Sequence, residues 1–232
     1  MGEHLGEKLI LAIKLGSYRI ELDLVTLLVS WLVMLLLILL ALFLRRGLRG
    51  PEEEPTRRQA LLEMTISALQ RWFGEGFHRE ELARDLFPLI ATIFLFVLFS
   101  NWISVIPGLQ SPTADLNVTL SLGLMVFFLS HYFGMRYKGV ARYWLGFIEP
   151  KMLLPFSLFL NFAGELAKPI SHSFRLFGNV LGGGILIAIV AAFMPLVVPA
   201  VFHAVYDIFI GAVQALVFAF LAVVYINIAV ER

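Results

Sequence analysis

MLLPFSLFLNFAGELAKPISHSFRLFGNVLGGGILIAIVAAFMPLVVPAVFHAVYDIFIGAVQALVFAFLAVVYINIAV, residues 152–230, is the stretch that decides the fold. Its only formal charges are Glu165, Lys168, Arg175 and Asp207. An apolar run far beyond ~18 residues is typical of membrane-spanning helices and does not fit a soluble core. The stretch therefore predicts helices that lie inside a lipid bilayer.

The natural break within this stretch is the segment 194–199, which contains two prolines. Proline ends helices and is favoured in the first turn of a new one. Helices over 150–194 and 199–230 would be ~67 Å and ~47 Å long, against a hydrocarbon core of ~30 Å. They must tilt or kink. Hydropathy leaves open whether 150–194 is one inclined helix, giving five crossings, or two short spans, giving six.

Three further uncharged runs predict spans over 24–44, 86–106 and 116–135. The segment 45–85 reads as a cytoplasmic linker that includes a helix between Gln59 and Phe77, with apolar residues at helical spacing among charged ones. Residues 1–23 form an outer N-terminal segment. The predicted fold is an all-α polytopic membrane protein, one membrane domain over 1–232, with about five transmembrane helices, the last two a long tilted hairpin, plus the interfacial amphipathic helix.

The composition excludes several classes of function. The 232 residues are 59% hydrophobic and 15% charged, with a formal net charge of +1. Nucleic-acid binding is therefore not expected, because no basic surface gathers phosphates. The absence of cysteine from the sequence excludes thiolate nucleophiles and zinc-thiolate sites. No His-Glu-x-x-His metal motif is present, and we expect neither a metal nor a cofactor.

The basic residues of the loops predict the orientation. Arginines cluster at 45–58, and Lys or Arg residues lie at 136–142, whereas the loop 107–115 has none. Short loops rich in Lys and Arg stay in the cytoplasm. We therefore expect the N-terminus outside and the C-terminus in the cytoplasm. The membrane in which we expect the protein is the bacterial inner (plasma) membrane.

Arg175 lies near the middle of the apolar stretch, where a charge costs about 2.5 to 3.5 kcal/mol on insertion scales. It shares one helical face with Ser171, Gly178, Asn179 and Gly182. The two glycines are a small-xxx-small pair, which allows close approach of another helix. Two interpretations remain: a charge that pairs with a carboxylate to lock two helices, or a charge presented to a cavity or a partner.

The last helix carries a second polar stripe, formed by Asp207, Gly211 and Gln214, with His203 one turn before the acid. Asp207 is either a structural counter-charge for the cations of the preceding helix or a titratable group in an aqueous path. Gln214 would lie on the same side as the acid. The stripe therefore adds a second candidate site.

Two smaller groups of polar residues are also candidates. Glu165 and Lys168, three residues apart, predict a local ion pair. Asn101, Asp115 and Asn117 lie at the outer ends of the middle spans, where they either cap the loop or line an outer vestibule.

These residues resemble subunit a of the F-type rotary ATP synthase. The resemblance is densest in Glu165-Leu-Ala-Lys-Pro-Ile-Ser171-His172-Ser-Phe-Arg175-Leu-Phe-Gly-Asn179 and returns in Gly211-Ala-Val-Gln214-Ala-Leu-Val-Phe218. It implies a stator subunit whose hairpin packs against the rotor c-ring, with peripheral stalk b subunits and the lipid bilayer as further partners. Two aqueous half-channels would load and unload protons, or sodium ions, on rotor carboxylates.

The resemblance also implies that Arg175 is the essential stator arginine, with Asn179 and Gln214 as polar neighbours. Many members carry Glu where this chain has Gly184 and His where it has Asp207, so the acid stands on the opposite helix here. We predict ion-translocation roles for Arg175, Asp207, Gln214, Asn179, Glu165, His172, Ser171 and His203, with Asn101, Asp115 and Asn117 as outer half-channel candidates.

Two other classes compete with this interpretation. A stand-alone secondary transporter would use Arg175 to bind an anionic substrate, but no inverted repeat is visible in the sequence. An intramembrane hydrolase would need a nucleophile and base pair, which the sequence does not offer. Co-purification with a ring of small two-helix subunits would discriminate between the classes.

Overall fold

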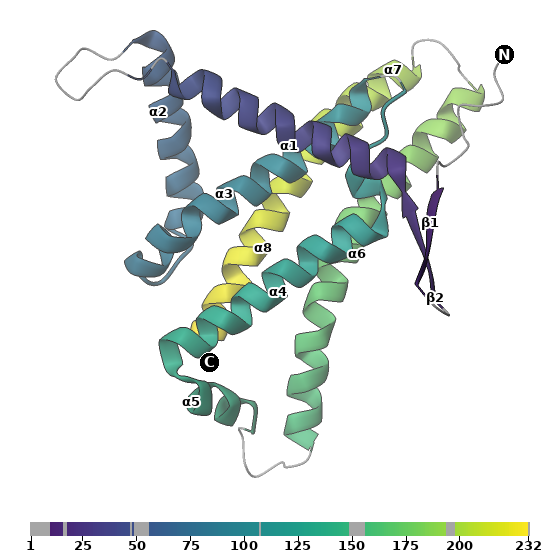
Figure 1. Cartoon of the computed structure of the whole chain (residues 1–232). Coiled ribbons are helices and arrows are strands. Elements are labelled where there is room, and N and C mark those ends of the chain that lie inside the picture. The colour runs from purple at the N-terminus through teal and green to yellow at the C-terminus, as the bar shows by residue number, and fades with distance from the viewer. Residues whose placement is uncertain are drawn as a thin grey trace.

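The computed structural model describes residues 10–15, 18–46, 48, 56–106, 108–148, 156–193 and 198–231 (Figure 1). Residues 194–197 of the predicted break at 194–199, the acidic linker 51–55 and the start of the 150–194 helix lie outside the described residues. The helices are α1 Leu24–Arg45, α2 Arg57–Leu69, η1 Gln70–Gly74, α3 Glu80–Trp102, η2 Ile103–Val105, η3 Pro112–Ala114, α4 Leu116–Lys138, α5 Val140–Leu145, η4 Gly146–Ile148, α6 Phe156–Phe193, α7 Val198–His203, η6 Ala204–Ile210 and α8 Gly211–Glu231.

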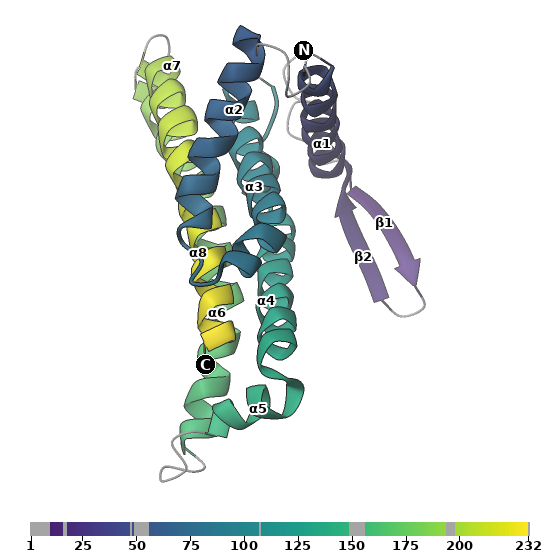
Figure 2. The ribbon, with the colours of Figure 1, turned by 90° about the vertical axis from the view of Figure 1, so that its left-hand side faces the viewer.

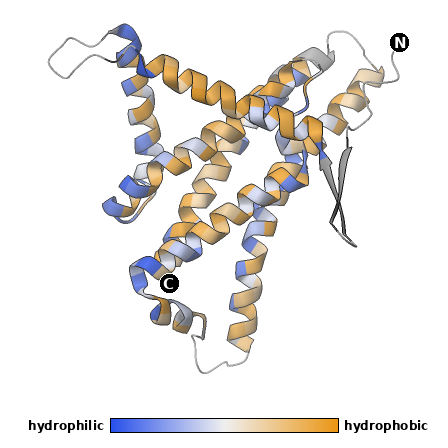
Figure 3. Cartoon of the chain, viewed as in Figure 1, coloured by the Kyte–Doolittle hydropathy of each residue, from blue (hydrophilic) through white to orange (hydrophobic). Residues whose placement is uncertain are grey.

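Five helical segments of the described chain are long and apolar enough to cross a membrane: Leu24–Arg45, Glu80–Val105, Leu116–Lys138, Leu158–Phe193 and Val201–Glu231. The predicted all-α polytopic fold is therefore confirmed. Figure 3 shows hydrophobic residues along most of α1, with hydrophilic residues gathered around α2 and the bend before α3. The chain is an integral membrane protein.

Helix α6 is one continuous helix, which decides between the two alternatives in favour of five spans. Pro169 lies inside it, and the hydroxyl of Ser173 donates to the Pro169 carbonyl across 2.7 Å. On α4, Gly123 faces this turn, and a Cβ at Gly123 would overlap the Ser173 hydroxyl. Close packing of α4 therefore supports α6 at the position where proline removes a backbone donor.

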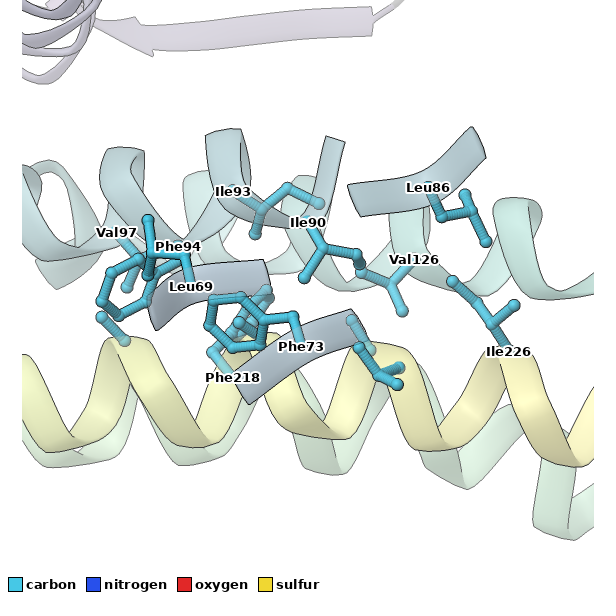
Figure 4. Close-up of a cluster of buried hydrophobic side chains, with 14 of the residues drawn as sticks. Leu69, Phe73, Leu86, Ile90, Ile93, Phe94, Val97, Val126, Phe218 and Ile226 are labelled. Carbon is cyan, nitrogen blue, oxygen red and sulfur yellow. The ribbon is translucent and has the colours of Figure 1, made fainter. Parts of the chain in front are cut away.

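Helices α3, α4, α6 and α8 form the packed bundle, and α1 lies to one side of it (Figure 2). The main core joins α3, α4 and α8 to the end of the α2–η1 segment (Figure 4). Phe73 of η1 is fully buried, with its ring centroid 5.4 Å from that of Phe94 and 5.3 Å from that of Phe220. This ring anchors the amphipathic segment to the bundle.

The last membrane segment is not a uniform α-helix. Between α7 and α8 the chain forms the π-helix η6, Ala204–Ile210. Two side chains at the end of α3 donate to carbonyls there: Asn101 Nδ2 to Gly211 O at 2.9 Å and Trp102 Nε1 to Ile208 O at 3.0 Å. The π-helix is thereby tied to α3, which holds Asp207 in place.

Two features differ in detail from the sequence prediction. An antiparallel hairpin, β1 Ile10–Leu15 and β2 Tyr18–Asp23, precedes α1, and Asp23 caps α1 by accepting from the Val25 backbone N–H at 3.0 Å. Helix α3 begins at Glu80, earlier than the uncharged run, because two glutamates suit the first turn of a helix and the helix extends past its apolar part.

Candidate functional site

Arg175 lies in the middle of α6, and it is exposed at the surface of the chain. Its backbone carbonyl accepts a hydrogen bond from Nε2 of Gln214 on α8, at 3.2 Å. The structure thus brings together Arg175 and Gln214, two residues that the sequence analysis selected. This contact with the main chain of Arg175 fixes the register of the two helices and does not involve the guanidinium.

The surface around Arg175 is formed by small residues. Ser171, Gly178 and Gly182 are exposed, and a Cβ built on either glycine would meet nothing within 4 Å. Gly184 is equally open. The face is therefore flat and uncovered, so the backbone of α6 is accessible to a partner helix.

The membrane-embedded acids have other partners. Glu165 accepts from Lys168 Nζ at 2.6 Å, and the Asp207 carboxylate lies 2.8 Å from His203 Nδ1. Within the described residues, Arg175 forms no ion pair with a carboxylate. The local pair of Glu165 and Lys168 was expected, whereas the alternative in which Asp207 neutralises Arg175 finds no support in this geometry.

A small cavity lies between α3, α6 and η6. Its volume is about 20 Å³, and it is lined by Asn101, Ser104, Asn179, Val180, Tyr206, Asp207 and Gly211. Three residues that the sequence analysis selected, Asn101, Asn179 and Asp207, thus border one space. Tyr206 was not selected, because it lies off the stripe of Asp207, Gly211 and Gln214; its position next to the acid was the only signal.

His172 is buried at the interface of α6 and α8. Its ring lies 3.7 Å, centroid to centroid, from that of Phe218 and 5.6 Å from that of Tyr225. Neither ring nitrogen has a hydrogen-bond partner among the described residues. Lys168 Nζ lies 5.8 Å above the same Tyr225 ring. His172 and the pair of Glu165 with Lys168 therefore belong to one part of the hairpin, on the opposite side of Arg175 from Asp207.

The outer candidates have different positions. Asn101 is buried and also accepts from Thr113 Oγ1 at 2.6 Å, which connects the segment before α4 to α3. Asp115 caps α4 by accepting from the backbone N–H and the side-chain amide of Asn117, at 2.7 and 3.0 Å. Asp115 and Asn117 do not line the cavity, so their contacts correspond to the loop-capping alternative.

Among the described residues, no group of three His, Asp or Glu side chains is placed to hold a metal ion. The polar side chains of the hairpin instead form a series of separate hydrogen-bonding groups at different depths. Such a series can exchange protons with water and position charges. It offers no nucleophile paired with a base.

Comparisons with known proteins identify the family. Residues 27–227 match the family model described as ATP synthase A chain. The chain is 40% identical over 177 residues to ATP synthase subunit a of Campylobacter hominis, covering 76% of this chain and 77% of that protein. It is 40% identical to ATP synthase subunit a 1 of Syntrophotalea carbinolica, covering 88% and 84%, and 38% identical to ATP synthase subunit a of Helicobacter pylori, covering 87% and 88%.

Proposed function

This chain belongs to the ATP synthase subunit a family, and we propose that it is the stator subunit that carries ions to and from the rotor of that complex. In this proposal, two aqueous half-channels load and unload protons, or sodium ions, on carboxylates of a rotor c-ring. Arg175 separates the two channels. Ion flow is thereby coupled to rotation and to ATP synthesis.

The observation that supports the proposal most directly is the setting of Arg175. A guanidinium at mid-membrane depth is expensive, by about 2.5 to 3.5 kcal/mol on insertion scales, unless it meets an opposite charge or water. Here it projects from a face made of Ser171, Gly178 and Gly182, and the nearby acids pair with Lys168 and His203. A partner helix that carries a carboxylate would fit this flat face and neutralise the arginine.

The chemistry of arginine suits a fixed barrier. Arginine stays protonated in proteins, so Arg175 cannot relay a proton. A rotor carboxylate that faces it is favoured ionised, whereas the same carboxylate facing lipid is favoured protonated by desolvation. Each elementary charge that crosses ~100 mV gains ~2.3 kcal/mol, which biases the direction of rotation.

The polar groups on either side of Arg175 give the two half-channels. Glu165 lies about 15 Å before Arg175 along α6, near Lys168 and His172. Asp207 borders the cavity with Asn179, one turn beyond Arg175. The two groups are offset along the helix axis in opposite directions, as two channels that open to opposite sides of the membrane require.

The orientation is part of the proposal. With the Arg-rich ends of α1 and α4 in the cytoplasm, the N-terminus lies outside and Asp207 belongs to the outer channel. Single cysteines in this cysteine-free sequence report the topology. We expect a membrane-impermeant reagent added outside to label Gln110→Cys and not Leu48→Cys; the reverse pattern would invert the two channels.

The contact with the rotor is testable by cross-linking in the whole synthase. Gly182→Cys should form a disulfide with a cysteine placed on the rotor helix about two turns from its carboxylate, since Gly182 lies about two turns beyond Arg175 and a disulfide needs Cα atoms within about 7 Å. Leu39→Cys on α1 is the matched control, because Leu39 is also exposed and α1 lies to one side of the bundle, away from α6 (Figure 2). Cross-linking of Leu39→Cys but not Gly182→Cys would refute the docking face.

A further inference from the structure

The ring of Tyr206 on η6 packs against Gly183 on α6. A Cβ added to Gly183 would overlap the Tyr206 ring, so that ring lies directly on the glycine backbone. Gly183 is buried by this contact, unlike Gly178, Gly182 and Gly184 on other sides of the same helix. Gly183 therefore makes room for the Tyr206 ring and is not part of the open face around Arg175.

The hydroxyl of Tyr206 extends the contact. It donates to Oδ1 of Asn179 at 3.2 Å, which fixes the orientation of that amide one turn beyond Arg175. The next residue in the chain is Asp207, and one of its carboxylate oxygens is bound by His203. Tyr206 thus connects the acid of η6 with the amide of α6 that lies nearest the arginine.

The cavity beside these groups has the size of one water molecule. Its volume of about 20 Å³ exceeds the roughly 10 to 15 Å³ that a single water needs. Asp207, Tyr206, Ser104 and Asn179, which carry polar side chains, are among the residues that line it. A buried water needs two to four polar partners, and each of these four residues carries a group that can donate or accept a hydrogen bond.

We propose that this cavity binds a single water molecule that exchanges protons with Asp207, and that Tyr206 is the positioning residue that holds it. The water accepts a proton from the outer side and releases one of its own to the Asp207 carboxylate, so it is unchanged after the transfer. This inference rests on the proposed ion-carrying function. It adds Tyr206, Gly183 and Ser104 to the residues of the proposed outer half-channel.

The test uses Tyr206→Phe in the complete synthase, reconstituted in liposomes. The phenyl ring keeps its place on Gly183, so assembly should be normal, while proton-driven ATP synthesis should slow about three- to tenfold, the range for one lost hydrogen bond. Because proton delivery then limits rotation, the rate should rise with outer acidity more steeply than in the wild type. Tyr132→Phe, which removes a hydroxyl from the exposed side of α4, should change neither.

A second pair of variants tests whether the position of the Tyr206 ring beside the cavity matters. Gly183→Ala should displace the Tyr206 ring and slow synthesis, and adding Tyr206→Ala should not slow it further, because the ring is already out of place. Equal slowing of Tyr206→Phe at every outer pH would reduce the tyrosine to a packing residue, and an unchanged rate would remove it from the path. Failure of the ion-carrying function itself would appear separately, as intact coupling in Arg175→Ala.

Discussion

The side-chain amide of Gln214 on α8 donates a hydrogen bond to the backbone carbonyl of Arg175 on α6, at 3.2 Å. A carbonyl inside a helix already accepts from its own helix, so this bond is additional and fixes where the two helices cross. The bond does not involve the arginine's side chain, and Arg175 is exposed. The position of the guanidinium therefore depends on α8 as well as on α6.

We expect Gln214→Leu to slow ion-coupled ATP synthesis without preventing assembly. The lost hydrogen bond is worth about 0.5 to 1.5 kcal/mol, too little to unfold the bundle but enough to loosen the register at Arg175. The measurement is synthesis by reconstituted complexes, with the amount of assembled subunit determined in parallel. A normal rate at normal assembly would show that the register does not matter for coupling.

Asp207→Asn should slow ion flux strongly while the complex remains intact. The amide keeps the size of the carboxylate and its contact with His203 but cannot gain and lose a proton in the working range. Proton uptake by inverted vesicles during ATP hydrolysis measures the effect. Asp115→Asn, at the cap of α4, is the control and should leave flux near the wild-type rate. Unchanged flux in Asp207→Asn would make the acid a structural partner of His203.

Gly178→Leu tests the open face of α6. The new side chain meets nothing within this chain, so insertion and folding should be normal, whereas a rotor helix would clash with it and coupling should be lost. Gly74→Leu is a matched control, since that glycine is also open but lies on the α2–η1 segment. Blue-native electrophoresis reports assembly, and ATP synthesis reports coupling. Full coupling in Gly178→Leu would place the rotor elsewhere.

Phe73→Ala should destabilise the attachment of the α2–η1 segment. Phe73 is fully buried between Phe94 and Phe220, and truncation of such a ring costs about 3 to 5 kcal/mol. Trp72→Ala, at 51% exposure, should cost much less. Limited proteolysis in detergent would measure the difference as faster cleavage near residue 75 in Phe73→Ala alone. Equal cleavage of the two variants would mean that the segment is not anchored through Phe73.

The sequence predicts the membrane fold well, because the length of an uncharged run is a direct physical requirement of the bilayer. It could not decide whether α6 is continuous, since Pro169 and the charges nearby look like a break. The answer depends on Ser173 and on the close approach of Gly123 from α4, which are tertiary contacts. The hairpin before α1 was missed, although residues 18–23 alternate in polarity as a strand does.

The candidate site could be predicted only in part. Helical periodicity predicts that Arg175 lies on the same face as Gly178 and Gly182. This prediction assumes α-helical spacing throughout. The π-helix at 204–210 changes the direction of its side chains, so Tyr206 joins Asp207 at the cavity even though it lies off the α-helical stripe. The sequence pattern also could not predict that Asp207 pairs with His203 and not with Arg175, because either basic residue could pair with the acid.

Arg175→Ala in the complete synthase tests the central claim most directly. The account predicts that the subunit inserts and assembles at nearly normal levels, that ion-coupled ATP synthesis is abolished, and that Arg175→Lys restores little of it, because an ammonium lacks the planar fork and loses its proton more readily when desolvated. Arg136→Ala, at the end of α4, should keep synthesis. The account is contradicted if assembled Arg175→Ala complexes still couple ion flow to ATP synthesis.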